Sequence, residues 1–164
     1  MNVCRLGVGV LSACVVGSAA LLAATFGEPN DPPTSGKTVS PPVIRMTGMI
    51  EEGDAIRLRN MLVALRREAS RTPAGPLAIL ELSSLGGDLL EGMKLGYMFR
   101  EFDVATMVRA GDLCLSSCAL AFLGGTETHI PTHVPGRTIE VGGEVGFHAF
   151  WLNASGVKRT PDDG

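Results

Sequence analysis

An alternation of short apolar runs with helix-period segments, from residue 43 to residue 123, constrains the fold more than any other feature. Residues 43–50, 77–82 and 104–108 are apolar runs of strand length. After Asp54 the apolar residues follow the period of one helix face, at Leu58, Met61, Leu62, Leu65 and Ala69. Residues 89–102 and 114–123 are the next two expected helices. The alternation predicts an α/β fold with a layered βαβ core and right-handed crossovers.

Beyond Thr126 the pattern changes to short strands, which we expect at residues 138–141 and 145–151. All three expected helices precede Thr126, and a parallel sheet needs cover on both faces. We expect no helix after Thr126 to cover the second face. We therefore expect a truncated domain at residues 43–164 that forms a homo-oligomer or is marginally stable.

The first 26 residues have the composition of an export signal. Arg5 provides a positive start, and residues 6–26 are 21 positions without a charge. Cleavage near Ala20, Ala23 or Ala24, retention as a membrane anchor through residues 6–26, and lipidation at Cys14 are all open. Each alternative places the rest of the chain outside the cytoplasm, in the periplasm or facing it. Residues 27–42 contain five prolines and are expected to be a linker.

The charge balance excludes one class of partner. The chain has 14 Lys and Arg against 17 Asp and Glu, a formal charge of −3. Without a basic excess, the phosphate contacts that drive nucleic-acid binding are not favoured. We expect no nucleic-acid partner.

Cys114 and Cys118 are the only cysteines outside the leader. In an oxidising compartment, two cysteines four positions apart can form a disulfide. The loop it would close is small and adds little chain-entropy stabilisation, so we expect a local clamp.

Three features fall at the expected carboxyl ends of strands, where open α/β sheets place their ligand sites. The pair Gly86-Gly87 follows one strand, Ser116 and Ser117 lie at the start of an apolar helix, and His148 lies on a strand between aromatic residues. Taken alone, each feature has a structural explanation. The glycine pair could form a tight turn, a serine could be a helix N-cap, and the histidine could be a hydrogen-bonded structural residue.

Together the three features resemble a known family. Residues 83–87 (Ser-Ser-Leu-Gly-Gly), Ser116 29 positions after Gly87, and a Gly-Phe-His strand resemble the Clp-protease proteolytic subunit. The Cys-x-Ser-x-Cys form and the leader look like the secreted Clp-protease-like proteins of the crotonase superfamily. The resemblance covers roughly residues 43–152. It implies a Clp-protease/crotonase-like layered βαβ core, here expected to lack the family's C-terminal helices. It also implies an exported serine hydrolase of peptidase type, acting on peptides or proteins without a cofactor.

Carried over by position, the resemblance makes Ser116 the nucleophile and His148 its general base. The backbone amides of Gly87 and Ser117 would form the oxyanion hole. Ser117 is the alternative nucleophile, but only Ser116 keeps the family's spacing from the glycine pair.

The sequence departs from the family at three places. Leu85 replaces a proline, and 22 residues separate Gly125 from His148, more than in the family. The family's third triad residue, an aspartate, lies far beyond the histidine, whereas Asp162 and Asp163 are close to it in sequence.

Four alternatives remain at this stage. Cys114, Cys118, His129 and His133 approximate a zinc spacing, which Pro131 between the histidines and the apolar segment after Cys118 oppose, so no metal is expected. Lys158 would be the base of a serine–lysine dyad, although its neighbours suggest an exposed charge. Acyl-CoA chemistry of the crotonase type is disfavoured by export. The alternative from another class is a catalytically inactive scaffold or binding module.

Overall fold

The computed structural model describes residues 23–29, 40–68, 75–129 and 132–149. Its main sheet has five strands in the order β1-β2-β3-β4-β8. They are β1 (Thr25–Phe26), β2 (Val43–Thr47), β3 (Ala78–Ser83), β4 (Val104–Val108) and β8 (Arg137–Ile139). The last four are parallel, and β1 pairs antiparallel with β2. The chain is thus a mixed α/β protein, as the alternation predicted.

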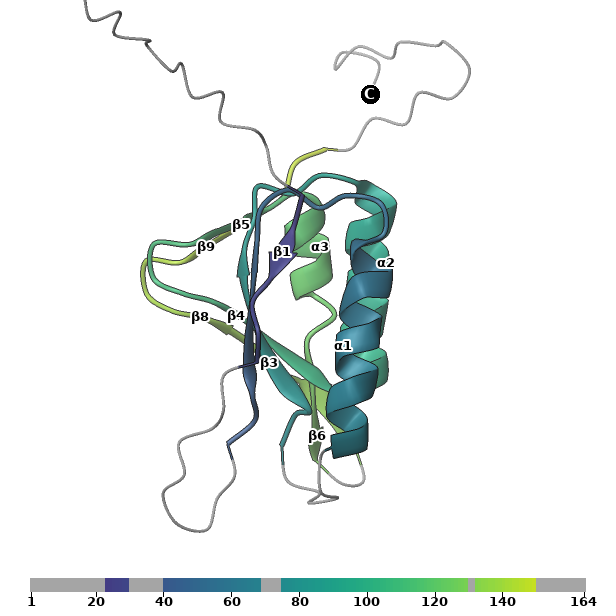
Figure 1. Cartoon of the computed structure of the whole chain (residues 1–164). Helices are drawn as coiled ribbons and strands as arrows, with labels where there is room; N and C mark the ends of the chain where they lie inside the picture. The colour runs from purple at the N-terminus through teal and green to yellow at the C-terminus, as the bar shows by residue number, and fades with distance from the viewer. Residues whose placement is uncertain (1–22, 30–39, 69–74, 130–131, 150–164) are drawn as a thin grey trace, which may run out of the picture.

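Two helices connect the parallel strands. Helix α1 (Asp54–Glu68) joins β2 to β3, and α2 (Leu89–Phe102) joins β3 to β4. Figure 1 shows both helices on the same face of the sheet. Helix α2 begins where the Asp88 side chain accepts from the amide of Glu91 at 2.8 Å, and it ends at Asp103 with φ 56°.

Smaller elements complete the fold. Strand β5 (Leu113–Leu115) pairs in parallel with β9 (Glu144–Gly146), and α3 (Ser117–Phe122) follows β5. Strands β6 (Thr126–His129) and β7 (Thr132–Pro135) form an antiparallel hairpin. In Figure 1, β5 and β9 lie beside the upper half of the main sheet, and β6 lies near its lower end.

The core lies between the sheet and the helices. Alternate strand residues face the helices, and the buried helix residues follow the helical period. Fully buried members are Ile44, Met46, Leu58, Leu62, Leu80, Leu82, Leu95, Phe99 and Val104. Burying each such side chain contributes roughly 1.5–3 kcal/mol.

The helices α2 and α3 pack closely because glycine occupies the contact. A Cβ added at Gly92 would lie 2.7 Å from Cβ of Ser117, and one at Gly124 would lie 2.0 Å from the carbonyl oxygen of Gly96. Both distances are too short for real side chains. The lack of a side chain at Gly92 therefore sets the position of Ser117 and of the start of α3.

Several boundaries differ from the sequence expectation. The strands expected at residues 43–50 and 138–141 are β2 (Val43–Thr47) and β8 (Arg137–Ile139). The strand expected at residues 145–151 is β9, which ends at Gly146, so His148 lies beyond the strand and not on it. The helix expected at residues 114–123 begins at Ser117, because Cys114 and Leu115 belong to β5. The sheet also includes β1, whose residues we assigned to the leader, and Ala24 before it is buried. Residues 1–22 and 150–164 lie outside the described residues. Within the part of the chain that the structure describes, no helix has the length and apolar character needed to span a bilayer.

Candidate active site

Ser116 occupies the junction between β5 and α3. Its backbone has φ 58° and ψ −123°, a conformation that L-residues rarely adopt. Such a conformation costs about 1–3 kcal/mol and persists only where the surroundings enforce it. The amide of Ser116 donates to the carbonyl of Gly146 at 2.9 Å, which ties this residue to the end of β9. Only 9% of Ser116 is exposed.

His148 lies against the Ser116 side chain. Its Nε2 is 2.8 Å from Oγ of Ser116, and its Nδ1 is 2.8 Å from the carbonyl oxygen of Ala149. A carbonyl only accepts, so Nδ1 carries the proton and Nε2 accepts from the serine hydroxyl. This is the tautomer that a general base requires.

The parallel pairing of β5 with β9 explains why these two residues meet. Leu115 pairs with Gly146, so Ser116 is one residue beyond the pair and His148 is two residues beyond it. Ser116 and His148 therefore each follow one of two paired strands that end at the same place. The residues that the spacing singled out are therefore brought together by strand register.

The glycine turn after β3 lies directly beneath Ser116. A Cβ at Gly86, whose φ is 100°, would lie 2.7 Å from Cβ of Ser116 and 2.7 Å from the carbonyl oxygen of Leu115. A Cβ at Gly87 would lie 2.1 Å from the carbonyl oxygen of Ile50. Neither position has room for a side chain, which explains the glycine pair.

Two backbone amides stand next to this turn. Ile50 bridges to Gly87 through bonds that use the carbonyl of Gly86 and the amide of Asp88, so the amide of Gly87 takes part in neither. Ser117 is the first residue of α3, and the amide of a first helical residue has no acceptor within its helix. Neither amide has a hydrogen-bond acceptor among the residues that the structure describes, so both are donors next to Ser116.

The Ser117 side chain is in a different position from that of Ser116. It is fully buried, and its Oγ has no hydrogen-bond partner among the described residues. Because His148 contacts Ser116, the geometry favours Ser116 as the nucleophile over Ser117.

Cys114 and Cys118 form a disulfide with a Cα–Cα distance of 5.2 Å. Both residues are fully buried. A zinc site at these residues would require free thiolates, which the disulfide removes. Among the described residues, no group of His, Cys, Asp and Glu has the arrangement of a metal site. Lys158, Asp162 and Asp163 lie outside the described residues.

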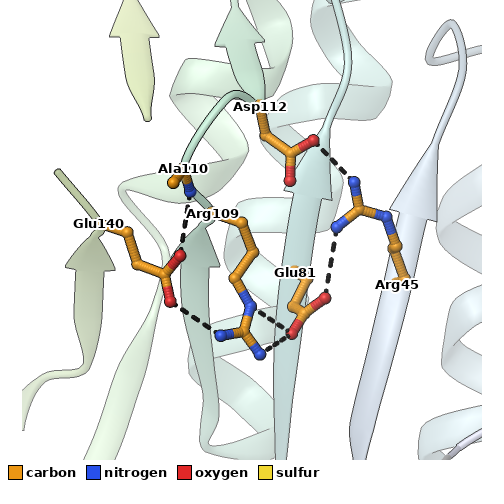
Figure 2. Close-up of polar contacts among 6 residues, drawn as sticks. All are labelled: Arg45, Glu81, Arg109, Ala110, Asp112 and Glu140. Carbon is orange, nitrogen blue, oxygen red and sulfur yellow. Dashed lines mark hydrogen bonds and ion pairs between the residues drawn. The ribbon is translucent and has the colours of Figure 1, made fainter. Parts of the chain in front are cut away.

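An ion-pair network supports the loop that leads into β5 (Figure 2). Glu81 of β3 bonds Arg45 at 3.3 Å and the Arg109 Nε at 2.7 Å. Arg45 also bonds Asp112 at 2.7 Å, immediately before β5. Figure 2 shows Glu140 completing the network, with one carboxylate oxygen toward Arg109 and the other toward the Ala110 amide.

The network lowers the pKa of Asp112 and the pKa of Glu140. The hydrogen bond from Arg45 holds the pKa of Asp112 below its ordinary value, although partial burial opposes the shift. The Ala110 amide, followed by Arg109, lowers the pKa of Glu140. Sequence analysis missed this cluster. Its one signal was Glu81, a charge in an otherwise apolar strand.

A separate cavity lies away from the serine–histidine pair. It has a volume of about 320 Å³ and is lined by Arg100, Thr126, Val134, Pro135 and Arg137. None of the candidate site residues lines it. The proposed chemistry therefore does not involve this cavity.

The fold and the site define a mixed α/β protein with a hydrogen-bonded serine–histidine pair at the ends of two parallel strands. Comparison with known proteins finds no relative: no family model, curated protein or solved structure matches the chain. The geometry of the site and the motif resemblance are the grounds for a functional proposal.

Proposed function

We propose that this protein is an exported serine hydrolase of peptidase type. The observation that carries the proposal is the 2.8 Å contact between Oγ of Ser116 and Nε2 of His148. A serine hydroxyl becomes nucleophilic when an adjacent base accepts its proton. The strained backbone of Ser116 supports the same proposal, since backbone strain concentrates at active sites.

The reaction would proceed by acyl transfer. Ser116 Oγ attacks the substrate carbonyl carbon while His148 Nε2 takes the hydroxyl proton. The amides of Gly87 and Ser117 donate to the oxyanion of the tetrahedral intermediate. His148 then gives the proton to the leaving group, and the same residue activates the water that hydrolyses the acyl-enzyme.

The Ala149 carbonyl has a supporting role in this scheme. By accepting from Nδ1 of His148, it keeps the imidazole in the tautomer that leaves Nε2 free to accept. The same bond strengthens when His148 becomes positively charged during the reaction. The carbonyl thereby orients the base without ionising itself.

Hydrolysis assays test the proposal. The wild-type protein should hydrolyse an activated ester and a denatured protein substrate, whereas Ser116→Ala and His148→Ala should each lose activity by a factor of about 10³ or more. Ser40→Ala is a matched control, because Ser40 is exposed and lies outside the site. Activity that survives Ser116→Ala would contradict the proposal. A folded wild-type protein without activity on either substrate would favour the scaffold alternative.

We also propose that the protein assembles with copies of itself. Large apolar side chains remain exposed in the described chain, including Val141 at 99% and Phe147 at 55%. Exposed apolar patches commonly mark interfaces between subunits. Sedimentation velocity should show an oligomer, and a monodisperse monomer across the concentration range would contradict this expectation.

A further inference from the structure

The disulfide spans the proposed nucleophile symmetrically. Cys114 is two residues before Ser116 and lies in β5, while Cys118 is two residues after it and lies in the first turn of α3. We propose that this disulfide is a positioning device, which holds Ser116 in its reactive backbone conformation. The inference rests on the proposed function, because it concerns the reactivity of Ser116.

The strand side of the junction is well held by hydrogen bonds. Cys114 bridges to Ser84, and the Leu115 amide donates to the Ser84 carbonyl at 2.9 Å. On the other flank, β5 pairs with β9. The chain up to Leu115 therefore cannot rotate without breaking sheet contacts on two sides.

The helix side is held by fewer hydrogen bonds. Helix α3 has six residues, and the Ser116 side chain makes no capping bond to it. Its first turn is closed by the Leu120 amide, which donates to the Ser116 carbonyl at 3.2 Å. The disulfide adds a covalent link from this first turn back to the anchored strand.

This covalent link restrains the φ torsion of Ser116, which sets where its side chain lies in the site. Ser116 has a positive φ, and a return to negative φ would rotate its Cβ and the chain that follows relative to the preceding peptide plane. The Oγ would then leave its 2.8 Å contact with His148. A fixed Cys114–Cys118 distance opposes this rotation because the rotation reorients α3 relative to β5.

Global stabilisation alone does not account for the placement. The cysteines are four positions apart, and a disulfide that closes so short a loop removes little entropy from the unfolded chain. Removing the disulfide should therefore change the reactivity of Ser116 more than it changes the melting temperature.

Inactivation kinetics with a fluorophosphonate provide the test. The exported wild-type protein is compared with the double variant Cys114→Ala/Cys118→Ala. For both proteins the maximal inactivation rate, the half-saturating probe concentration, the circular dichroism spectrum and the melting temperature are measured. We expect the maximal rate to fall about 10- to 100-fold, while the half-saturating concentration stays within about twofold. A general loss of structure would instead alter circular dichroism and probe binding as well.

Reduction of the wild-type protein gives a second measurement that does not depend on the folding of a variant. Phosphine treatment, monitored by thiol counting, should lower the labelling rate, and reoxidation should restore it. The double variant should not respond to the phosphine. An unchanged rate in the reduced protein, or in a folded double variant, overturns the positioning role. Absence of labelling in the oxidised wild type overturns the proposed function, and this inference with it.

Discussion

The Ser116 hydroxyl lies 2.8 Å from Nε2 of His148, although 32 positions separate the two residues in sequence. The contact follows from the parallel pairing of Leu115 with Gly146. Strand register therefore determines whether the two groups can react together. The same register lets the amide of Ser116, whose backbone is strained, donate to the carbonyl of Gly146.

The positive φ of Ser116 predicts an inverted effect of glycine on stability. Ser116→Gly should be more stable than Ser116→Ala by about 1 kcal/mol, because glycine adopts positive φ without strain. At the neighbouring helical position the order should reverse, with Ser117→Ala more stable than Ser117→Gly by about 0.5–1 kcal/mol. Urea unfolding of the four variants provides the comparison. A Ser116→Ala variant as stable as Ser116→Gly, or more stable, would contradict the strained backbone of Ser116.

Close packing at Gly92 predicts a loss of stability and of activity together. In Gly92→Ala the new Cβ would lie 2.5 Å from the Ser117 carbonyl oxygen, so α3 must move. Overpacking of this kind costs about 1–3 kcal/mol, which exceeds the helix-propensity gain of about 1 kcal/mol.

Gly96→Ala, on the same helix, is the matched control for this substitution. Its nearest contact would be 3.2 Å from the Leu120 carbonyl oxygen, so the neighbour has to shift far less. Gly92→Ala should have a lower melting temperature and a lower rate of ester hydrolysis than Gly96→Ala. An equally stable and active Gly92→Ala would contradict the packing argument.

The lowered pKa of Asp112 predicts an acid-sensitive contribution to stability. Its folded pKa is below the ordinary value of 3.8. This contribution is therefore fully present above about pH 4 and is lost as pH falls through the folded pKa. Arg45→Met removes the cation that contacts both Asp112 and Glu81, so it should destabilise the protein by about 1 kcal/mol at pH 7 and by less at pH 3, where carboxylates begin to protonate.

Urea unfolding of wild type and Arg45→Met at both pH values checks this sign. Methionine retains the apolar stem of the Arg45 side chain, which limits the loss of packing. An equal loss of stability at pH 7 and pH 3 would mean that packing, and not the Asp112 charge, explains the effect.

The larger elements of the fold were predictable from local sequence. The segment at residues 89–102 predicted α2 and the run at residues 104–108 predicted β4, both with the observed bounds. These signals suffice because each segment has one strong period and clear ends.

The junction at Ser116 could not be placed from local sequence. Three residues of strand β5 and the six residues of α3 form one apolar run, in which periodicity does not separate strand from helix. The break lies where Gly86 approaches Ser116 and where β5 pairs with β9, which are tertiary contacts. Strand β1 was missed for a related reason, because its uncharged residues continue the composition of the leader.

The candidate residues came from the motif resemblance, whereas their geometry could not be predicted. The interval from Gly87 to Ser116 matched the family that the motifs resemble, but the contact of Ser116 with His148 depends on pairing between β5 and β9 across a 28-residue connection. The ion-pair network was missed since Arg45, Glu81 and Asp112 are distant in sequence and meet only across neighbouring strands.

The most direct measurement of the central claim is the site of covalent labelling by a fluorophosphonate. The oxidised wild-type protein is treated with the probe, digested and examined by mass spectrometry. The account predicts one adduct, on Ser116, which Ser116→Ala abolishes and His148→Ala slows by about 10²-fold or more. An adduct on Ser117, or labelling that persists in Ser116→Ala, would contradict it.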